Sequence, residues 1–422
     1  MRINSQLIKQ SILPLMLGQL GLALAQGIQF LIVARTLGPH EFGKVAGILA
    51  ITGALLPFSG LGSANTMVMH LARGSKEASL LYGNALFACL FTGALLTLST
   101  TGITLAISDT QGLWLCTLVF CISELVVTKL VDISQHAFLG LEKHAIASRF
   151  LLVQSLFRLG GALVLTIMFQ APTALQWACV HLAAGAVAAV LVVAYTRRQT
   201  GHLWLGIRRL CDDIRTGVFF SLGLSARSVY MDIDKAVLAH QVSLSVNGAY
   251  TAAFRLVFMA TTPLTAGLLA IQAKMYRAGA EDGLKKTTAI AKKAIVAGVA
   301  YGAFVGMALY LFAPLLPYVL GVKYTQSVTM LQALAFLPIP LFVQSALSDA
   351  LAAANFQRAR SFVQISVAGL SFVLNTVLIS HLSWKGAVIA TYSCQIALAL
   401  MMAYMVASKL NQSPSKSIEP RP

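Results

Sequence analysis

The stretch ALQWACVHLAAGAVAAVLVVAYTRR, residues 174–198, contains no Asp, Glu, Lys or Arg before its last two positions. About twenty mainly apolar residues in a row are what a helix needs to cross the hydrocarbon core of a bilayer. Similar runs recur along the whole chain, in which 57% of 422 residues are hydrophobic and only 11% are charged. Soluble domains carry roughly 25% charged residues. The sequence therefore predicts an all-α integral membrane protein.

Twelve apolar runs predict about twelve transmembrane helices with short connections. The predicted spans are residues 11–33, 44–66, 80–107, 112–134, 149–169, 174–196, 217–240, 248–272, 289–312, 327–352, 360–381 and 385–408. Pro338 and Pro340 lie inside the tenth span, where a missing backbone donor allows a kink. The segment NQSPSKSIEPRP, residues 411–422, is polar and rich in proline, and we expect it to be a disordered cytoplasmic tail.

The distribution of Lys and Arg predicts the orientation of these spans. With the N-terminus inside, 22 of the 31 basic residues fall in cytoplasmic segments and four in outward segments, while five lie within spans. Cytoplasmic loops carry such an excess, so both termini are predicted to be cytoplasmic. The same rule explains the formal charge of +17. No cluster interleaves aromatic with basic residues, and we expect no nucleic-acid partner.

The basic segment TRRQTGHLWLGIRRLCDDIRTG, residues 196–217, separates six predicted spans from six others. A shift of 205 residues brings four glycines of the first half onto four of the second: Gly18, Gly43, Gly62 and Gly74 onto Gly223, Gly248, Gly267 and Gly279. A shift by an even number of spans indicates parallel repeats. We therefore predict two six-helix lobes, residues 1–207 and 208–410.

The segment SARSVYMDIDKAVLAH, residues 225–240, places four charged residues in the seventh predicted span: Arg227, Asp232, Asp234 and Lys235. A charged side chain at the bilayer centre costs about 2.5–3.5 kcal/mol on insertion scales, so most of the four should face protein or a wet cavity. Asp232 and Lys235 are i,i+3 neighbours and can pair. Arg255 enters the eighth span at a similar depth, and we expect Asp232 or Asp234 to neutralise it.

Two interpretations of this cluster stay open. It is either a group of ion pairs that joins two helices, or a surface that contacts an anionic headgroup or a coupling cation. In the first half, Glu124 and Arg158 lie at similar depth in the fourth and fifth spans and are expected to pair. Lys129 and Asp132 are again i,i+3 neighbours, but they lie near the inner end, where snorkelling is a sufficient explanation. Arg35, beside the first outward loop, either touches a substrate or lies at the headgroup level.

No pattern in the sequence indicates catalysis. There is no GxxxxGK[ST] motif for a nucleotide and no nucleophile at a fixed spacing from a base. The six cysteines and eight histidines lack the spacing of zinc ligands. We therefore predict a protein that is not an enzyme, with no catalytic residue, no metal and no cofactor.

Several segments resemble Wzx-type polysaccharide flippases of the multidrug/oligosaccharidyl-lipid/polysaccharide exporter superfamily. QFLIVARTLGPHEFGKVAG, residues 29–47, is similar to that family's first outward loop, A-R-x-L-G-P-x-x-[FY]-G. MDIDKAVLAHQVSLSVNGAYTAAFRL, residues 231–256, resembles its seventh and eighth spans, where an Asp-Lys pair precedes G-x-Y-x-A-A-x-R. FSGLG (58–62), HLARG (70–74) and GVKYTQSVTMLQALA (321–335) are similar to further segments, so the resemblance extends over most of the chain.

The resemblance implies a flippase of the bacterial inner (plasma) membrane that moves an undecaprenyl-diphosphate-linked oligosaccharide to the outer leaflet by alternating access. The product would serve the synthesis of O-antigen, capsule or exopolysaccharide. The implied partners are this lipid-linked oligosaccharide, membrane lipid and a polysaccharide polymerase. We expect four arginines to bind the diphosphate or sugar in a cleft between the lobes: Arg227, Arg255, Arg158 and Arg35. Coupling or ion pairing is expected of four other residues: Asp232, Asp234, Lys235 and Glu124.

Three alternatives to this function remain. A cation-coupled multidrug/toxin antiporter of the same superfamily would use the carboxylates as its primary site, which leaves the excess of cations unexplained. A lipid II flippase typically has two more spans. A membrane-embedded polymerase or ligase usually carries a long periplasmic loop, whereas every outward segment predicted here is short.

Overall fold

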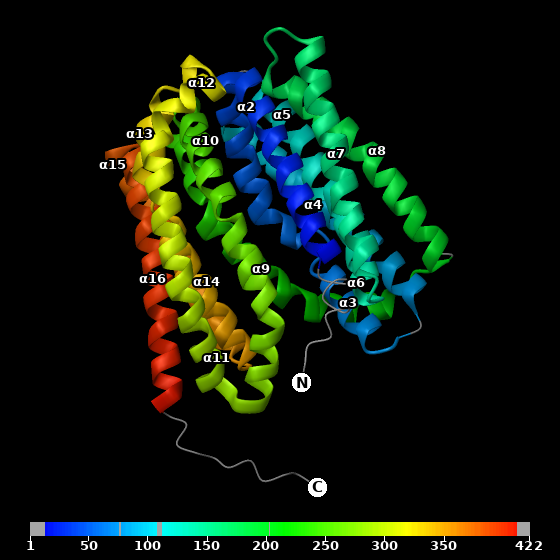
Figure 1. Cartoon of the computed structure of the whole chain (residues 1–422). Coiled ribbons are helices and arrows are strands. Elements are labelled where there is room, and N and C mark those ends of the chain that lie inside the picture. The colour runs from blue at the N-terminus through cyan, green and yellow to red at the C-terminus, as the bar shows by residue number, and fades with distance from the viewer. Residues whose placement is uncertain (1–12, 76, 108–111, 202, 412–422) are drawn as a thin grey trace. The chain divides into compact units, whose positions relative to one another are not determined.

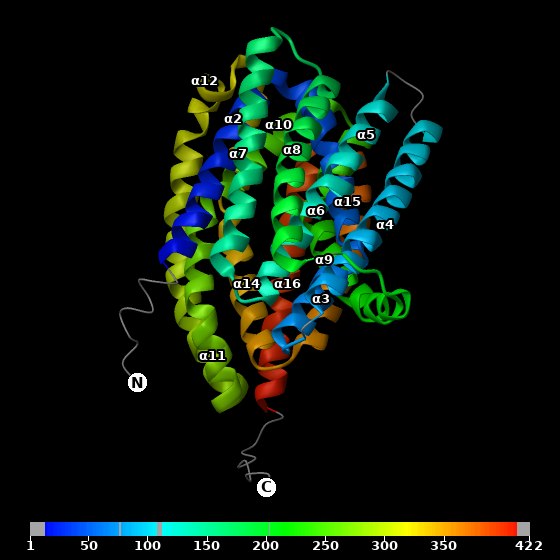
Figure 2. The same ribbon diagram turned by 90° about the vertical axis from the view of Figure 1, so that its right-hand side faces the viewer.

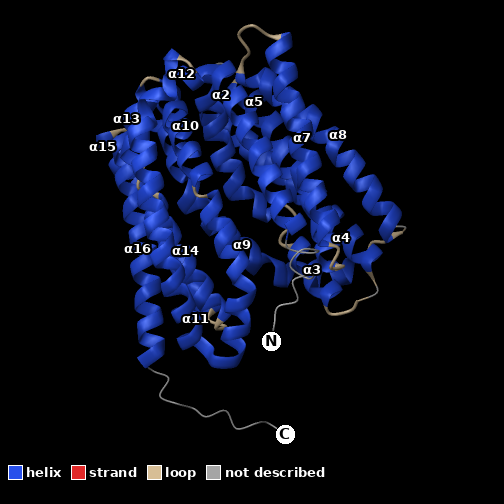
Figure 3. Cartoon of the chain, viewed as in Figure 1, coloured by secondary structure: helices blue, strands red, loops and turns tan. Residues whose placement is uncertain are grey.

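The computed structural model describes residues 13–75, 77–107, 112–201 and 203–411. These residues form helices joined by short turns, and this described part contains no strand (Figure 3). The predicted all-α fold is therefore confirmed. Of the predicted tail, Asn411 ends the last helix and residues 412–422 lie outside the described residues.

The described residues form two compact units. The first comprises residues up to 248 together with 318–324, and the second comprises 249–317 and the residues from 325 onward. The elements of the first unit are α2 (Leu13–Leu55), η2 (Leu56–Phe58), α3 (Ser63–Ala72), α4 (Ala78–Ile107), α5 (Leu113–Cys121), η3 (Ile122–Thr128), α6 (Lys129–Gly140), α7 (His144–Met168), α8 (Ala174–Thr200), α9 (Ile207–Gln241), the start of α10 (Leu244–Ala260), the end of α12 (Leu316–Leu320) and η5 (Val322–Tyr324). Helices α7 and α8 lie side by side in both views (Figures 1 and 2).

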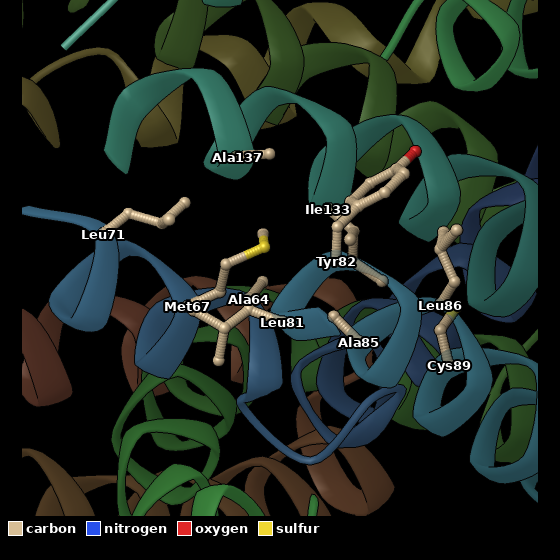
Figure 4. Packing of buried hydrophobic residues seen from close by; sticks show 10 residues of the cluster. All are labelled: Ala64, Met67, Leu71, Leu81, Tyr82, Ala85, Leu86, Cys89, Ile133 and Ala137. Atoms are coloured by element: carbon tan, nitrogen blue, oxygen red, sulfur yellow. The ribbon is translucent and has the colours of Figure 1, made fainter. Parts of the chain in front are cut away.

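One core of the first unit lies where α3, α4 and α6 meet (Figure 4). Met67 of α3, Tyr82 of α4 and Ile133 of α6 are almost completely buried there. The Tyr82 hydroxyl lies 2.8 Å from the Ser134 hydroxyl, so its polar end is satisfied inside an apolar cluster.

The second unit contains the rest of α10 with α11 (Thr262–Phe312), η4 (Ala313–Leu315), α13 (Gln326–Leu334), α14 (Pro338–Ala353), α15 (Gln357–Leu382) and α16 (Trp384–Asn411). Leu264 and Leu268 of α11 pack against Phe342 of α14. Helices α13 and α14 are bent by 42° at the break before Pro338. The tenth predicted span is thus bent beside the prolines, which allow such a kink.

By length and composition, nine helices of the described part could cross a membrane, or ten if the bent pair α13–α14 is one span. Two features account for the difference from the twelve predicted spans. The first two spans are merged in α2, which Gly38 breaks at φ 72° and ψ 169° before Pro39. Helix α9 carries the charged residues of the seventh span and is not among the nine. With these two additions the described helices match all twelve predicted spans.

The basic segment 196–217 lies between the sixth and seventh predicted spans and was interpreted as a loop. It is mostly helical, so this prediction is wrong. Helix α8 continues to Thr200 and α9 begins at Ile207, ten residues before the predicted start. Hydropathy could not locate these ends because helix propensity does not require apolar residues, and Arg is a good helix former. The Asn84 side chain holds the connection: its Nδ2 donates to the Gly206 carbonyl at 3.3 Å, and its Oδ1 accepts from the Gly206 N–H at 2.9 Å.

Helix α9 packs along α2 and belongs to the first unit. The hydroxyls of Ser221 and Ser225 donate to the carbonyls of Pro57 and Ala54, at 2.7 and 2.8 Å. The compact units therefore do not divide the chain after residue 207. The predicted division into lobes 1–207 and 208–410 stays a prediction.

Gly43 and Gly248, which the internal repeat relates, lie against each other in the first unit. A Cβ on Gly43 would overlap the Leu244 carbonyl, and one on Gly248 would overlap that of Pro39. Asn247 Nδ2 donates to the Gly43 carbonyl at 2.8 Å. The backbones of α2 and α10 can approach this closely only because neither glycine has a side chain.

We expect Gly43→Ala to destabilise the protein by about 1–3 kcal/mol, because the added methyl group forces α2 and α10 apart. Gly53→Ala is the matched control in the same helix, since a Cβ at Gly53 meets nothing within 4 Å. There the change should be neutral or stabilising, because Ala is favoured over Gly in helices by about 1 kcal/mol. Thermal unfolding in detergent measures both variants. Equal melting temperatures for the two would contradict the close approach.

Candidate functional site

The fourth predicted span contains a π-helical segment, η3, that carries Glu124. The Thr128 hydroxyl donates to the Ser123 carbonyl, five residues earlier, at 2.8 Å. The Leu125 carbonyl accepts a hydrogen bond from the Ser59 hydroxyl at 2.5 Å. A side chain from outside the π-helical segment therefore supplies a hydrogen-bond partner for its backbone. Such segments are rare and are frequent at functional sites. No feature of the sequence indicated this one.

Glu124 lies at the centre of a buried triad with Arg158 of α7 and His181 of α8. Arg158 Nη2 donates to Glu124 Oε1 at 2.9 Å and to the Thr128 hydroxyl oxygen at 2.6 Å. His181 Nε2 lies 2.8 Å from the same Glu124 Oε1. The predicted pair of Glu124 and Arg158 is therefore confirmed. His181 was missed because a single histidine in an apolar run carries no spacing signal.

The triad lies inside the protein. The exposed fractions of its side chains are 14% for Glu124, 16% for Arg158 and 7% for His181. The His181 ring lies between Trp177 and Phe120, with centroids 5.1 and 5.8 Å away. Arg158 Nε and His181 Nδ1 are buried and have no hydrogen-bond partner in the described part of the chain. One carboxylate oxygen of Glu124 therefore connects η3 with both α7 and α8.

A second buried cluster lies in α9 and contains three of the predicted charged residues. Lys235 Nζ donates to Asp232 Oδ1 at 2.9 Å, to Asp234 Oδ1 at 3.2 Å and to the Met231 carbonyl at 2.9 Å. Lys235 and Asp234 are 5% and 3% exposed, whereas Asp232 is 42% exposed. The predicted pairing of Asp232 with Lys235 is confirmed. The single ammonium lies between two carboxylates, so these three side chains together are negative.

The remaining predicted arginines are on exposed positions. Arg227 of α9 is exposed, and no carboxylate pairs with it within the described ranges. Arg35 is also exposed, and its Nη1 donates to the Val319 carbonyl at 3.3 Å. Arg255 is exposed and lies in the second unit, whereas Asp232 and Asp234 lie in the first. Its pairing with either carboxylate stays a prediction.

Two segments that carry the family resemblance meet in the first unit. The Tyr324 hydroxyl donates to the Ala34 carbonyl at 2.7 Å. After the break at Gly38, in the second half of α2, Glu41 accepts from Lys44 Nζ at 2.6 Å and from the Ala174 N–H, at the start of α8, at 2.7 Å. A carboxylate suits a helix N-terminus, where free N–H groups and the helix dipole favour negative charge. Arg35 lies in the same helix, before the break.

At the other end of the same unit, Lys129 Nζ donates to Asp132 Oδ2 at 2.6 Å, and His70 Nε2 lies 3.0 Å from Asp213 Oδ1. Sequence reasoning anticipated the first pair but not the second, which joins α3 to α9. No group of three or more His, Cys, Asp or Glu side chains is arranged to hold a metal ion among the described residues.

This helical arrangement has the fold of MATE-type transporters of the MOP superfamily. One similar structure is the inward-facing conformation of a multidrug resistance MATE family transporter, at 16% identity and a TM-score of 0.74 over 93% of this chain and 96% of that one. The outward-facing conformation of a multidrug resistance MATE family transporter is similar at 15% identity, with a TM-score of 0.63 over 95% and 97%. A MOP superfamily transporter from Pyrococcus furiosus is similar at 16% identity, with a TM-score of 0.62 over 94% of each chain.

The model of the family described as polysaccharide biosynthesis protein matches residues 8–271. The chain belongs to this family, and the resemblance found in the sequence is confirmed at that level. Comparison of the sequence with curated proteins finds no match.

Proposed function

We propose that the protein is a flippase that moves an undecaprenyl-diphosphate-linked oligosaccharide across the inner membrane for surface polysaccharide synthesis. The observation that carries this proposal is the family match over residues 8–271 in a chain with the fold of membrane transporters. A polysaccharide pathway needs one step in which a lipid-linked sugar crosses the bilayer, and a helical transporter fold suits that step. Alternating access would bring the substrate from one side to the other.

The substrate's diphosphate cannot cross hydrocarbon alone and needs fixed cations. Arg227 and Arg255 are the residues proposed to bind it, since both are exposed and lie in predicted spans. A guanidinium offers forked donors that match phosphate oxygens and stays charged at every physiological pH. Arg35, beside the first loop, is proposed to contact the sugar or diphosphate near one membrane surface.

Arg158 was expected to join this group, but its charge is already met by Glu124 at 2.9 Å. We therefore assign it with Glu124 and His181 to the coupling of transport, in which the carboxylate takes up and releases a proton or exchanges cations. Asp232, Asp234 and Lys235 are proposed to serve as ion pairs within α9 that neutralise charge in the span.

A cation-coupled multidrug antiporter is the second candidate. It is supported by the similar multidrug MATE structures. In that case the carboxylates would bind an organic cation directly.

The deciding experiment is deletion of the gene in its host, followed by analysis of the surface polysaccharide and of lipid-linked intermediates. A flippase predicts loss of the polymer and accumulation of its undecaprenyl-diphosphate-linked repeat unit, both reversed by the wild-type gene. An antiporter predicts an unchanged polymer and greater sensitivity to cationic dyes such as ethidium. Normal polymer with no accumulated intermediate would reject the flippase function.

The protein is proposed to lie in the bacterial inner membrane with both termini in the cytoplasm. Cys211, in the first turns of α9, is exposed and offers a native labelling site. A variant with Cys211 as its only cysteine should react with a membrane-impermeant maleimide only after the cells are opened. A cysteine-free variant carrying Ser245→Cys should react in intact cells. Labelling of Cys211 in intact cells would reverse the predicted orientation.

A further inference from the structure

A cavity of about 740 Å³, widely open to the surface of the protein, lies in the first unit beside α8. Its wall includes Val127 of η3, Leu130 of α6, and Ala186 and Val190 of α8, and it reaches Arg197 and Arg198 in the last turn of α8. Apart from the two arginines, every lining residue is Ala, Val, Leu or Gly. None of the functional roles assigned above uses this cavity.

The walls of the cavity are suited to a hydrocarbon chain rather than to water or a polar solute. Aliphatic side chains offer no hydrogen-bond partner, and a water molecule needs two to four polar partners to be held. From Ala186 to Arg197 the helix rises about 16 Å at 1.5 Å per residue, so an apolar path of that length leads to the cations. The volume is in the range of about 300–1,000 Å³ that is usual for small-molecule sites.

The two arginines at the end of the path are suited to an anionic headgroup. Both are exposed, and neither has a carboxylate partner within the described residues. They lie at the end of α8 that the distribution of Lys and Arg predicts to be cytoplasmic. Basic residues at that level attract the anionic lipids of the cytoplasmic leaflet, and arginine offers paired donors to a phosphate.

We propose that this cavity is a binding site for an anionic phospholipid. One acyl chain lies along α8 against Val127 and Val190, and the phosphate is bound by Arg197 and Arg198. The site is separate from the residues proposed to bind the transported diphosphate, and the proposal does not depend on the flippase function.

The position of Val127 links this lipid to the triad. Val127 belongs to η3, the same π-helical segment that carries Glu124. Its Cγ1 would lie 3.5 Å from a Cβ at Gly185 of α8, so η3 and α8 are in close contact at the cavity wall. A bound acyl chain would therefore pack directly on the segment that holds Glu124 in place.

Native mass spectrometry of the purified full chain, with added phosphatidylglycerol or phosphatidylcholine, tests the proposal. We expect wild-type protein to retain phosphatidylglycerol in preference to phosphatidylcholine. The double variant Arg197→Gln/Arg198→Gln should bind phosphatidylglycerol about tenfold more weakly. The control Arg73→Gln/Arg358→Gln removes the same charge from exposed positions that do not line the cavity, and it should bind like wild type.

A second variant tests the apolar part of the site without changing charge. Ala186→Phe fills the cavity and should reduce retention of phosphatidylglycerol while the arginines remain. If the double Gln variant fails to fold, Arg197→Lys/Arg198→Lys replaces it and should retain intermediate binding. Equal retention of the two lipids by wild-type protein would overturn the proposal, as would unchanged binding by Ala186→Phe. Two further outcomes would also overturn the proposal. A wild-type dimer without lipid would assign the cavity to a second copy of the chain. Preferential retention of co-purified undecaprenyl diphosphate would assign it to the transported lipid.

Discussion

Replacing Arg158 by Gln should lower the free energy of unfolding by about 3–5 kcal/mol, because a buried carboxylate then loses its cationic partner. The guanidinium lies 2.9 Å from Glu124 Oε1, and both side chains are mostly buried. The double variant Glu124→Gln/Arg158→Gln removes the uncompensated charge as well. It should therefore be more stable than Arg158→Gln alone. Thermal unfolding in detergent, followed on a size-exclusion column, compares the three proteins.

The control for this cycle is Arg149→Gln. Arg149 lies near the start of the same helix, α7, and is exposed, so its replacement should change stability by no more than about 0.5 kcal/mol. A double variant no more stable than the worse single variant would show that Glu124 and Arg158 do not stabilise each other. Measuring polysaccharide export distinguishes a structural role of the pair from a role in coupling. If the pair serves coupling, the double variant should regain stability but not polysaccharide export. Full export by the double variant would remove the triad from the transport mechanism.

Replacing Arg227 by Gln should lower polysaccharide export by about 10–100-fold, the effect of losing one hydrogen-bonded contact to a charged group. The amount of protein in the membrane should stay normal, because Arg227 is exposed and no described carboxylate depends on it. Arg227→Lys keeps the charge but loses the forked geometry, so we expect a smaller loss. Arg255→Gln and Arg255→Lys should follow the same order. Export is measured as surface polymer per cell, normalised to membrane-bound protein.

Arg215→Gln is the matched control for Arg227, since Arg215 is exposed on the same helix but precedes the predicted span. It should export at the wild-type level. The double variant Arg227→Gln/Arg255→Gln should export almost nothing. Wild-type export by that double variant at a normal protein level would end the proposal that these arginines bind the diphosphate. A loss that Lys does not partly restore would indicate a packing role for Arg227 instead.

Several pairs within one helix could be predicted from spacing. Lys235 with Asp232 and Lys129 with Asp132 are i,i+3 neighbours, and the helix alone brings such side chains together. The pair of Glu124 with Arg158 was predicted from equal depth in two adjacent spans, which is a weaker argument. His181, Asp213 and Ser59 offered no such signal, because each contacts a residue of another helix at a distance in sequence of 57 residues or more.

Hydropathy and the positions of Lys and Arg are local properties, and they were sufficient to predict an all-α membrane protein with helices in twelve places. A helix in lipid can be apolar on every side, so its sequence does not indicate which face meets its neighbours. The rotation of α8 that brings His181 to Glu124, the π-helical turn of η3 and the contact of Gly43 with Gly248 therefore could not be predicted. These features depend on how whole helices pack, because each is stabilised by atoms from more than one element. Only the folded chain specifies them.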